Sequence, residues 1–257
     1  MIFLKLGGSL ITDKAEPLTA RSDVIKRLAA EIAAAWRASS DMSLLIGHGS
    51  GSFGHHAASQ SGTHLGAHSA GDWSGFVSVA FAARQLHQLV MQELVTAGLP
   101  AISFPPSSML LAHERQILSY HIAPIARALD HGLLPVVHGD VAFDDTQGSA
   151  IISTEQLFSA LAGEFHPARL LLAGLQPGVL GPDGETLAAI TGGDYEQLQF
   201  NQVPGEDVTG GMQAKVKQAL QWAARFPAAE ILIFSAEQPG TLQDVLGGSS
   251  AGTRVLP

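Results

Sequence analysis

Apolar runs of strand length alternate with longer segments of helical periodicity along most of the chain. The first run, Ile2 to Leu4, predicts a buried strand at the very start. Further short apolar runs predict strands at residues 43–46, 100–104, 133–138, 169–173, 230–235 and 254–256. Apolar residues at helical spacing predict helices over residues 21–37, 73–97, 121–130, 153–164 and 212–226. Strands that alternate with helices predict an α/β fold with a mainly parallel sheet and helices on both faces.

Turn and cap residues refine this pattern. Residues 141–152 predict a β-hairpin. Ser153 and Gln156 have the spacing of a capping box at the start of the next helix. Asp72 is the expected N-cap of the longest helix. Because no repeat or obvious linker interrupts the chain, one compact domain with two lobes is expected over residues 1–257.

Composition narrows the functional classes. Hydrophobic residues make up 46% of the 257 residues, which is enough for a sizeable core. The formal net charge of −9 disfavours a general nucleic-acid binder. The absence of cysteine excludes disulfides and thiolate metal sites. The chain opens on a strand and contains no apolar run near the roughly 18 residues of a membrane span, so a soluble cytoplasmic protein with no membrane partner is expected.

The first fourteen residues carry the first candidate chemistry. Gly7 and Gly8 follow the opening strand directly and precede Ser9, and adjacent glycines let backbone N–H groups approach an anion closely. Lys5 lies within the strand, where an unpaired lysine is costly to bury, and Lys14 lies just beyond the turn. A polyphosphate on the glycine turn with converging ammonium groups explains all of these features. The alternative is an edge strand with a snorkelling lysine.

Two further glycine clusters lie at residues 47–54 and at Gly210 and Gly211. The second of these opens a predicted helix, so its N–H groups would face an anion, and Lys215 is one turn further on. Together with the first glycine cluster, Gly210, Gly211 and Lys215 favour nucleotide binding. Residues 49–54 match G-x-G-x-x-G, but a turn-rich, histidine-rich stretch is expected to follow in place of the Rossmann helix. No P-loop motif occurs in the sequence.

Several histidines fall in the same region, at positions 48, 55, 56, 64 and 68. The i, i+4 spacing of His64 and His68 allows a zinc site, although the flanking glycines argue against a rigid helical pair. An imidazole that follows a glycine cradle is better suited to hydrogen bonding an anionic substrate. His55 is the candidate, because Gly54 permits close approach.

Four blocks resemble the amino-acid kinase superfamily: KLGGSLITDK at 5–14, GHGSGSFGHH at 47–56, HGDVAFD at 138–144 and DVTGGMQAKV at 207–216. Within it, Lys14 and the SFGH histidine resemble the isopentenyl phosphate kinase family. The resemblance implies a three-layer α/β/α open sandwich and a homodimer. It implies that the N-terminal half (about 1–150) binds isopentenyl phosphate and the C-terminal half (about 151–257) binds ATP. The implied reaction transfers the ATP γ-phosphoryl group to isopentenyl phosphate, with Mg²⁺ accompanying ATP and held chiefly by phosphate oxygens and water.

The resemblance also implies residue roles. Lys5 and Lys215 would hold the β- and γ-phosphates, Lys14 would contact the transferring group, and His55 would hold the acceptor phosphate. The implied nucleotide-binding set is Lys5, Gly7, Gly8, Ser9, Gly51, Glu155, Thr209, Gly210, Gly211 and Lys215. The implied substrate-binding set is Gly8, Ser50, Gly51, His55, Phe76, Phe81, Gly139 and Asp140. No protein group is expected to ligate the metal directly, and none is expected to act as a general base. The alternative for Asp140 and Asp144 is therefore a structural role.

An isoprenoid tail requires an apolar pocket. The predicted long helix offers one wall through residues 76, 77 and 79–81, including both Phe76 and Phe81. The alternative is that these are ordinary core residues.

Two segments depart from the family pattern. Residues 153–156 read STEQ where the family usually has SGDD, so Glu155 stands in for an aspartate that orients the lysines. Residues 174–180 lack both acids of the usual TDVDGVY-like segment, which affects the adenine and ribose contacts. A phosphonate kinase of the fosfomycin type is the nearest alternative function. A nucleotide-binding sensor without turnover is the alternative from another class, and carbamate, glutamate and uridylate kinases lack this histidine arrangement.

Overall fold

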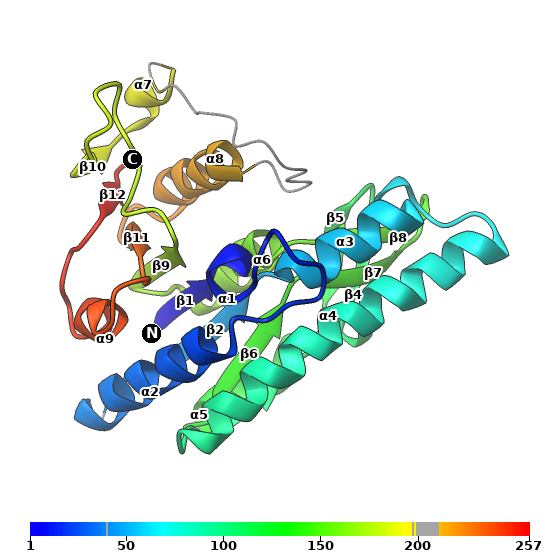
Figure 1. Cartoon of the computed structure of the whole chain (residues 1–257), viewed down its shortest axis with the longest axis horizontal. Coiled ribbons are helices and arrows are strands. Elements are labelled where there is room, and N and C mark those ends of the chain that lie inside the picture. The colour runs from blue at the N-terminus through cyan, green and yellow to red at the C-terminus, as the bar shows by residue number, and fades with distance from the viewer. Residues whose placement is uncertain (40, 197, 199–210) are drawn as a thin grey trace.

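A mainly parallel sheet runs through both halves of the chain (Figure 1). The structure is a computed structural model, and it describes residues 1–39, 41–196, 198 and 211–257. In this part of the chain the strand order is β10-β12-β11-β9-β1-β2-β6-β3, and every neighbouring pair is parallel except β11 with β12. The strands are β1 (Ile2–Leu6), β2 (Leu44–His48), β3 (Ala101–Ser103), β6 (Leu134–His138), β9 (Arg169–Gly174), β10 (Ala189–Ile190), β11 (Glu230–Ser235) and β12 (Thr253–Val255). The predicted mainly parallel α/β fold is therefore confirmed.

Helices cover both faces of this sheet because side chains alternate across β1. Leu4 and Leu6 pack into one apolar cluster, while Phe3 packs into the other. The first cluster contains residues of α2 (Ser22–Ala38), α4 (Ala70–Thr96) and α9 (Thr241–Leu246). The second contains residues of α5 (Ala123–Asp130), α6 (Thr154–Phe165) and α8 (Gly211–Arg225). Lys5 therefore emerges on the same face as α6 and α8.

A second sheet, β5-β4-β7-β8, lies beside the N-terminal half. Its strands are β4 (Leu110–His113), β5 (Gln116–Tyr120), β7 (Asp140–Asp144) and β8 (Gly148–Ile152). The predicted hairpin is β7–β8, whereas β4 and β5 were not predicted from the sequence. Their turn is formed by Glu114 and Arg115, which adopt positive φ of 48° and 63° without the usual glycine or asparagine. The Arg115 N–H donates to Asp144 at 2.8 Å, so a neighbouring hairpin holds this turn.

Asp144 therefore has a structural role, as the sequence-based alternative proposed. Its carboxylate also accepts the backbone N–H groups of Thr146 and Gln147. Burial works to raise the pKa of Asp144, but these hydrogen bonds, with those from Arg115 and the Thr146 hydroxyl, outweigh it and lower the pKa to about 2. The anionic side chain therefore joins both hairpin turns.

Shorter elements correct the expectation for residues 47–56. The chain forms a helix, α3 (Gly51–Ser61), where a turn was expected, so His55 and His56 are helical. The buried ring of Phe53 anchors this helix, which glycine and serine content had concealed. The other short elements are α1 (Gly8–Ile11), α7 (Gly192–Tyr195), η1 (Thr63–Leu65) and η2 (Pro106–Ser108).

Capping boxes begin helices α4, α6 and α7. Ser153 and Gln156 cap α6 as predicted. Ser69, and not Asp72, is the N-cap of α4; Asp72 is its partner three residues on, accepting the Ser69 N–H at 2.8 Å. Among the helices that the structure describes, none combines the length and apolarity needed to cross a bilayer.

Candidate functional site

Glycine turns at the carboxyl ends of β1, β2 and β6 touch one another. A Cβ atom built on Gly8 would lie 2.6 Å from the nitrogen of Gly51, and one built on Gly49 would lie 2.9 Å from the nitrogen of Gly8. Gly139, which follows β6, lies against Ser50, with 3.8 Å from its Cβ position to the Ser50 nitrogen. Side chains at Gly8 and Gly49 would separate the two loops. The structure therefore brings together three turns from well-separated parts of the chain.

Thr12 links the glycine turn after β1 to the one after β2 through two hydrogen bonds. Its hydroxyl donates to the Gly8 carbonyl at 2.8 Å and accepts the Ser52 N–H at 3.0 Å. The residue is buried, with 1% of its surface exposed. Thr12 is not identifiable from the sequence, because nothing in its local pattern distinguishes it from any other threonine beside a turn.

Two lysines and a carboxylate converge at the end of β1. Lys5 forms an ion pair with Glu155 on the first turn of α6. The Lys215 Nζ atom lies 3.3 Å from the Cβ position of Gly174, the last residue of the adjacent strand β9. Burial works to raise the pKa of Glu155, but the charge of Lys5, its hydrogen bond and the charge of Lys215 outweigh it and lower the pKa. Glu155 is therefore an anion held between two cations.

This arrangement excludes the edge-strand alternative for Lys5. Strand β1 pairs with β2 on one side and β9 on the other, so it is a central strand. Only 10% of the Lys5 side chain is exposed. A cation this buried needs a partner, which Glu155 supplies.

The amides of the first glycine turn have different uses. The Gly7 N–H donates to the Ala173 carbonyl at 2.9 Å, so the expectation that both glycines offer donors to an anion is wrong for Gly7. Gly8 and Ser9 open α1, where the first N–H groups have no acceptor within the helix. Gly7 instead allows close packing, since its Cβ position lies 3.0 Å from the Ala173 oxygen.

The remaining predicted phosphate-binding residues come from several elements. Ser50 is the N-cap residue of α3, and His55 lies half-buried in its second turn. Lys14 is exposed in the loop between α1 and α2. Gly211 begins α8 with a positive φ of 60°. Thr209 and Gly210 lie outside the described residues.

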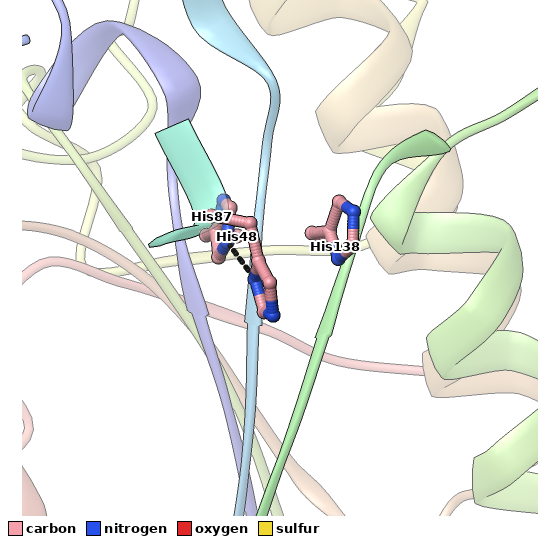
Figure 2. Close-up of side chains that lie close together, drawn as sticks. All are labelled: His48, His87 and His138. Carbon is pink, nitrogen blue, oxygen red and sulfur yellow. Dashed lines mark hydrogen bonds between the residues drawn. The ribbon is translucent and has the colours of Figure 1, made fainter. Parts of the chain in front are cut away.

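A buried polar cluster lies beneath the glycine turns (Figure 2). It contains His48 at the end of β2, His87 on α4 and His138 at the end of β6. His48 Nε2 and His87 Nδ1 are 2.8 Å apart, and the His138 ring stacks on that of His87 with centroids 4.1 Å apart. His48 thus meets two histidines remote in sequence, not the neighbours that suggested zinc. His87 and His138 were missed, because single histidines in a helix and a strand carry no distinctive pattern.

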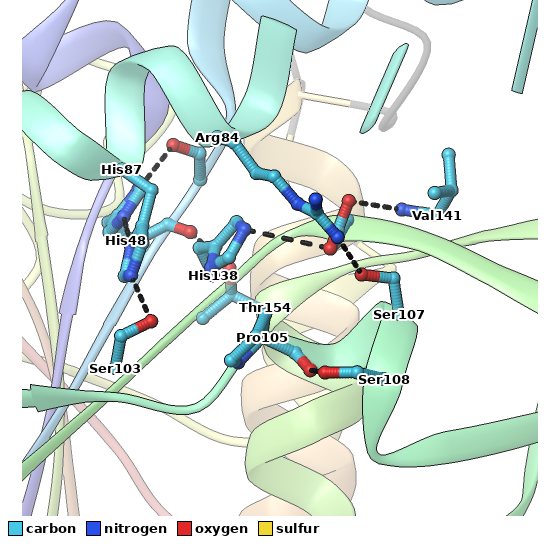
Figure 3. Close-up of polar contacts among 12 residues, drawn as sticks. His48, Arg84, His87, Ser103, Pro105, Ser107, Ser108, His138, Val141 and Thr154 are labelled. Carbon is cyan, nitrogen blue, oxygen red and sulfur yellow. Dashed lines mark hydrogen bonds and ion pairs between the residues drawn. The ribbon is translucent and has the colours of Figure 1, made fainter. Parts of the chain in front are cut away.

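Asp140 belongs to the edge of this cluster. Its Oδ1 accepts the Val141 N–H at 2.8 Å, and its Oδ2 lies 3.7 Å from His138 Nε2 (Figure 3). Burial raises the pKa of Asp140, opposed by hydrogen bonds from Ser107 and Val141 and by the charge of Arg84. Only 2% of the residue is exposed, which favours its structural alternative over substrate binding.

Comparisons with known proteins decide the family. The amino acid kinase family matches residues 1–235. The chain belongs to this family. The isopentenyl phosphate kinase of Methanothermobacter thermautotrophicus is 34% identical over 273 residues, covering 99% of this chain and 98% of the relative. That of Haloferax volcanii is 33% identical over 251 residues, covering 94% and 98%. A solved isopentenyl phosphate kinase structure has a TM-score of 0.84 at 32% identity, with 99% of both chains covered.

These findings confirm both the resemblance and the amino acid kinase fold. They also cover the two segments that depart from the family pattern, since the matches extend over nearly the whole chain. The first departure keeps its charge, because Glu155 still meets Lys5.

The apolar wall expected on α4 is only partly formed in this family member. Phe76 is buried and its ring lies 5.0 Å from that of Phe143 and 5.4 Å from that of Trp73, centroid to centroid. Phe81 is 63% exposed and Val77 is 64% exposed. At 3.6 residues per turn, Val77 and Phe81 lie about 100° and 140° around the helix from Phe76, so the three side chains do not point in one direction.

Proposed function

We propose that the chain is an isopentenyl phosphate kinase that transfers the γ-phosphoryl group of ATP to the phosphate of isopentenyl phosphate. The observation that carries this proposal is the convergence of Lys5, Glu155 and Lys215 beside touching glycine turns. Relatives that match almost the full length are named for this activity. Phosphoryl transfer requires positioning and charge neutralisation with little covalent work by the protein.

The residue roles follow from charge and reach. Lys5 on strand β1 and Lys215 on helix α8 neutralise the β- and γ-phosphates, and Glu155 keeps the Lys5 ammonium directed at the site. Lys14, on the exposed loop after α1, contacts the moving phosphoryl group in the transition state. His55 and the Ser50–Gly51 backbone hold the acceptor phosphate at the start of α3.

The two substrates approach from different halves. ATP binds the C-terminal half, with α8 and the end of β9 beside its phosphates, and isopentenyl phosphate binds the N-terminal half. Mg²⁺ accompanies ATP, and it is coordinated by phosphate oxygens and water because magnesium retains much of its hydration. An acceptor phosphate is already ionised near pH 7, so the reaction needs no general base. The buried carboxylate of Asp140 is consistent with this, since its environment disfavours a catalytic anion.

A coupled assay tests the proposal. Purified protein with Mg-ATP is presented with isopentenyl phosphate or fosfomycin, and ADP release is measured for each. Turnover with isopentenyl phosphate in preference to fosfomycin is expected. The reverse preference would assign the chain to the phosphonate kinases. Nucleotide binding without turnover of either acceptor would identify a sensor.

The chain is also proposed to act as a cytoplasmic homodimer. Val77, Phe81 and Val95 are 64%, 63% and 55% exposed, and their spacing places them on one face of α4. Ile102 on the edge strand β3 is 39% exposed. Apolar side chains gathered in this way are typical of an interface. Light scattering is expected to give a dimer mass that Phe81→Asp converts to the monomer mass.

A further inference from the structure

A chain of hydrogen bonds leads from β3 to the loop that follows β2, residues 49 and 50, which we call the acceptor loop. Ser103 Oγ lies 2.7 Å from His87 Nε2, and His87 Nδ1 lies 2.8 Å from His48 Nε2 (Figures 2 and 3). His48 Nδ1 then lies 3.0 Å from the carbonyl oxygen of Gly49. Four groups from two strand ends, those of β2 and β3, and one helix are therefore joined in series.

The last acceptor fixes the direction of every proton in this series. A carbonyl oxygen can only accept, so His48 Nδ1 carries the hydrogen and donates to Gly49. Burial lowers the pKa of His48 to about 4 and that of His87 to about 3, so both rings are neutral at pH 7. His48 Nε2 must then accept from the N–H at His87 Nδ1. His87 Nε2 must in turn accept the hydroxyl hydrogen of Ser103.

His48 holds the acceptor loop at two points. Its ring fixes the Gly49 carbonyl, while its own carbonyl accepts the Thr154 hydroxyl at 2.7 Å and the Gly139 N–H at 3.0 Å. A trans peptide directs its C=O and N–H to opposite sides. Anchoring the Gly49 oxygen toward the histidines therefore turns the N–H of Ser50 to the other side of the loop.

We propose that Ser103 and His87 are positioning residues that orient His48, so that the Gly49–Ser50 peptide presents its N–H group to the acceptor phosphate. This proposal rests on the proposed function for the identity of the acceptor. The hydrogen-bond order itself stands on the geometry alone.

A metal ion is a second use for the same histidines, since His48, His87 and His138 each place a nitrogen within 4.8 Å of the others. The geometry favours the hydrogen-bonded chain. Two of the three nitrogens already bond to each other at 2.8 Å. The third ring is parallel to that of His87 within 18°, and a ring nitrogen binds a metal in the plane of its ring, so His138 does not aim at the shared point.

Two substitutions of His87 separate orientation from packing. In His87→Asn the amide nitrogen takes the place of Nδ1 and still reaches His48, whereas in His87→Gln the amide reaches the Ser103 end. Glutamine fills the histidine volume better than asparagine does. A hydrogen-bond role therefore ranks Asn above Gln, and a packing role ranks Gln above Asn. The same two substitutions at exposed His131 serve as matched controls.

The measured quantities are KM for isopentenyl phosphate, KM for ATP, kcat and acceptor affinity by calorimetry. His87→Gln is expected to raise KM for the acceptor about tenfold, as loss of one buried hydrogen bond would, with little change in kcat or KM for ATP. His87→Asn is expected to stay within about threefold of wild type, and Ser103→Ala to fall between the two. A larger defect in His87→Asn than in His87→Gln would overturn the proposal.

Nitrogen NMR of the imidazoles tests the order of the protons without any turnover. Protonated Nδ1 is expected in both His48 and His87 of the wild-type protein, and His48 should lose this preference in His87→Gln. Protonated Nε2 in wild-type His48 would overturn the proposal even if the protein is an active kinase. One equivalent of zinc that is lost in His138→Ala would also overturn it, because the ion would occupy His48 Nε2. If wild-type protein shows no turnover, the proposed function fails and the NMR result still decides the hydrogen-bond order.

Discussion

Lys5 on the central strand β1 pairs with Glu155 on the first turn of α6, 150 residues later in the chain. Both side chains are largely buried, with 10% and 19% exposed. Removing one partner of a buried pair leaves an uncompensated charge, whereas a surface pair has little effect on stability. The pair therefore fixes where the Lys5 ammonium points.

Glu155→Gln is expected to lower kcat about tenfold or more, because Lys5 would no longer be held by a charge and could not neutralise the phosphates in a fixed geometry. Steady-state kinetics with saturating ATP and acceptor measures the effect. Glu164→Gln, on an exposed position of the same helix, is the control and should leave kcat unchanged. Equal kcat for Glu155→Gln and wild type would remove the ion pair from the reaction.

Lys14→Ala is expected to lower kcat far more than it raises either KM, since a contact made chiefly in the transition state affects the chemical step. A loss of about a hundredfold corresponds to one such charge contact, about 2.7 kcal/mol. Lys26→Ala, an exposed lysine of α2, is the matched control. A pure KM effect would assign Lys14 to ground-state binding instead.

His55→Ala is expected to weaken acceptor binding by about tenfold while leaving ATP affinity within about twofold, because one hydrogen bond to a charged phosphate is lost. Calorimetric titration of each ligand measures the two affinities separately. The adjacent half-buried His56 provides the control substitution, His56→Ala. A defect restricted to ATP affinity would contradict the assignment of His55 to the acceptor.

Stability is expected to fall as the pH drops from 7 to 5. Burial lowers the pKa of His48 to about 4 and that of His87 to about 3, from an ordinary value of 6.5. Below pH 6.5 the unfolded chain therefore binds more protons than the folded chain, until the folded pKa is reached. This stabilisation is complete above pH 6.5 and is lost as the pH falls, by about 2 kcal/mol per histidine between pH 7 and 5.

Urea denaturation at pH 7, 6 and 5 measures this dependence. The His87→Asn variant should show a smaller loss of unfolding free energy between pH 7 and 5, because one neutral buried imidazole is gone. His131→Asn should match the wild-type dependence. Identical pH dependence in wild type and His87→Asn would mean that His87 takes up its proton without unfolding.

The sequence by itself determined the main elements of the fold and the first ingredients of the site. Apolar periodicity is a local property, so β9, β11, α2 and the β7–β8 hairpin could be predicted within a few residues of their bounds. Glycine pairs after strands and lysines beside them are local too, and they pointed to Lys5, Gly8, Gly51 and Lys215. Helix α3 was not predicted, because its glycines and serines are typical of turns.

Only the tertiary structure decided which of these residues meet. The order of strands in the sheet brings the ends of β1, β2, β6 and β9 to one edge, and no local pattern encodes that order. In the folded chain Lys5 pairs with Glu155, and the Gly7 N–H donates to the Ala173 carbonyl. Phe76 is buried, whereas Phe81 is exposed. The tertiary structure also joined His48 to His87 and Ser103. Burial and the strict direction of hydrogen bonds, which arise only when distant segments pack together, give these ordinary residues their specific roles.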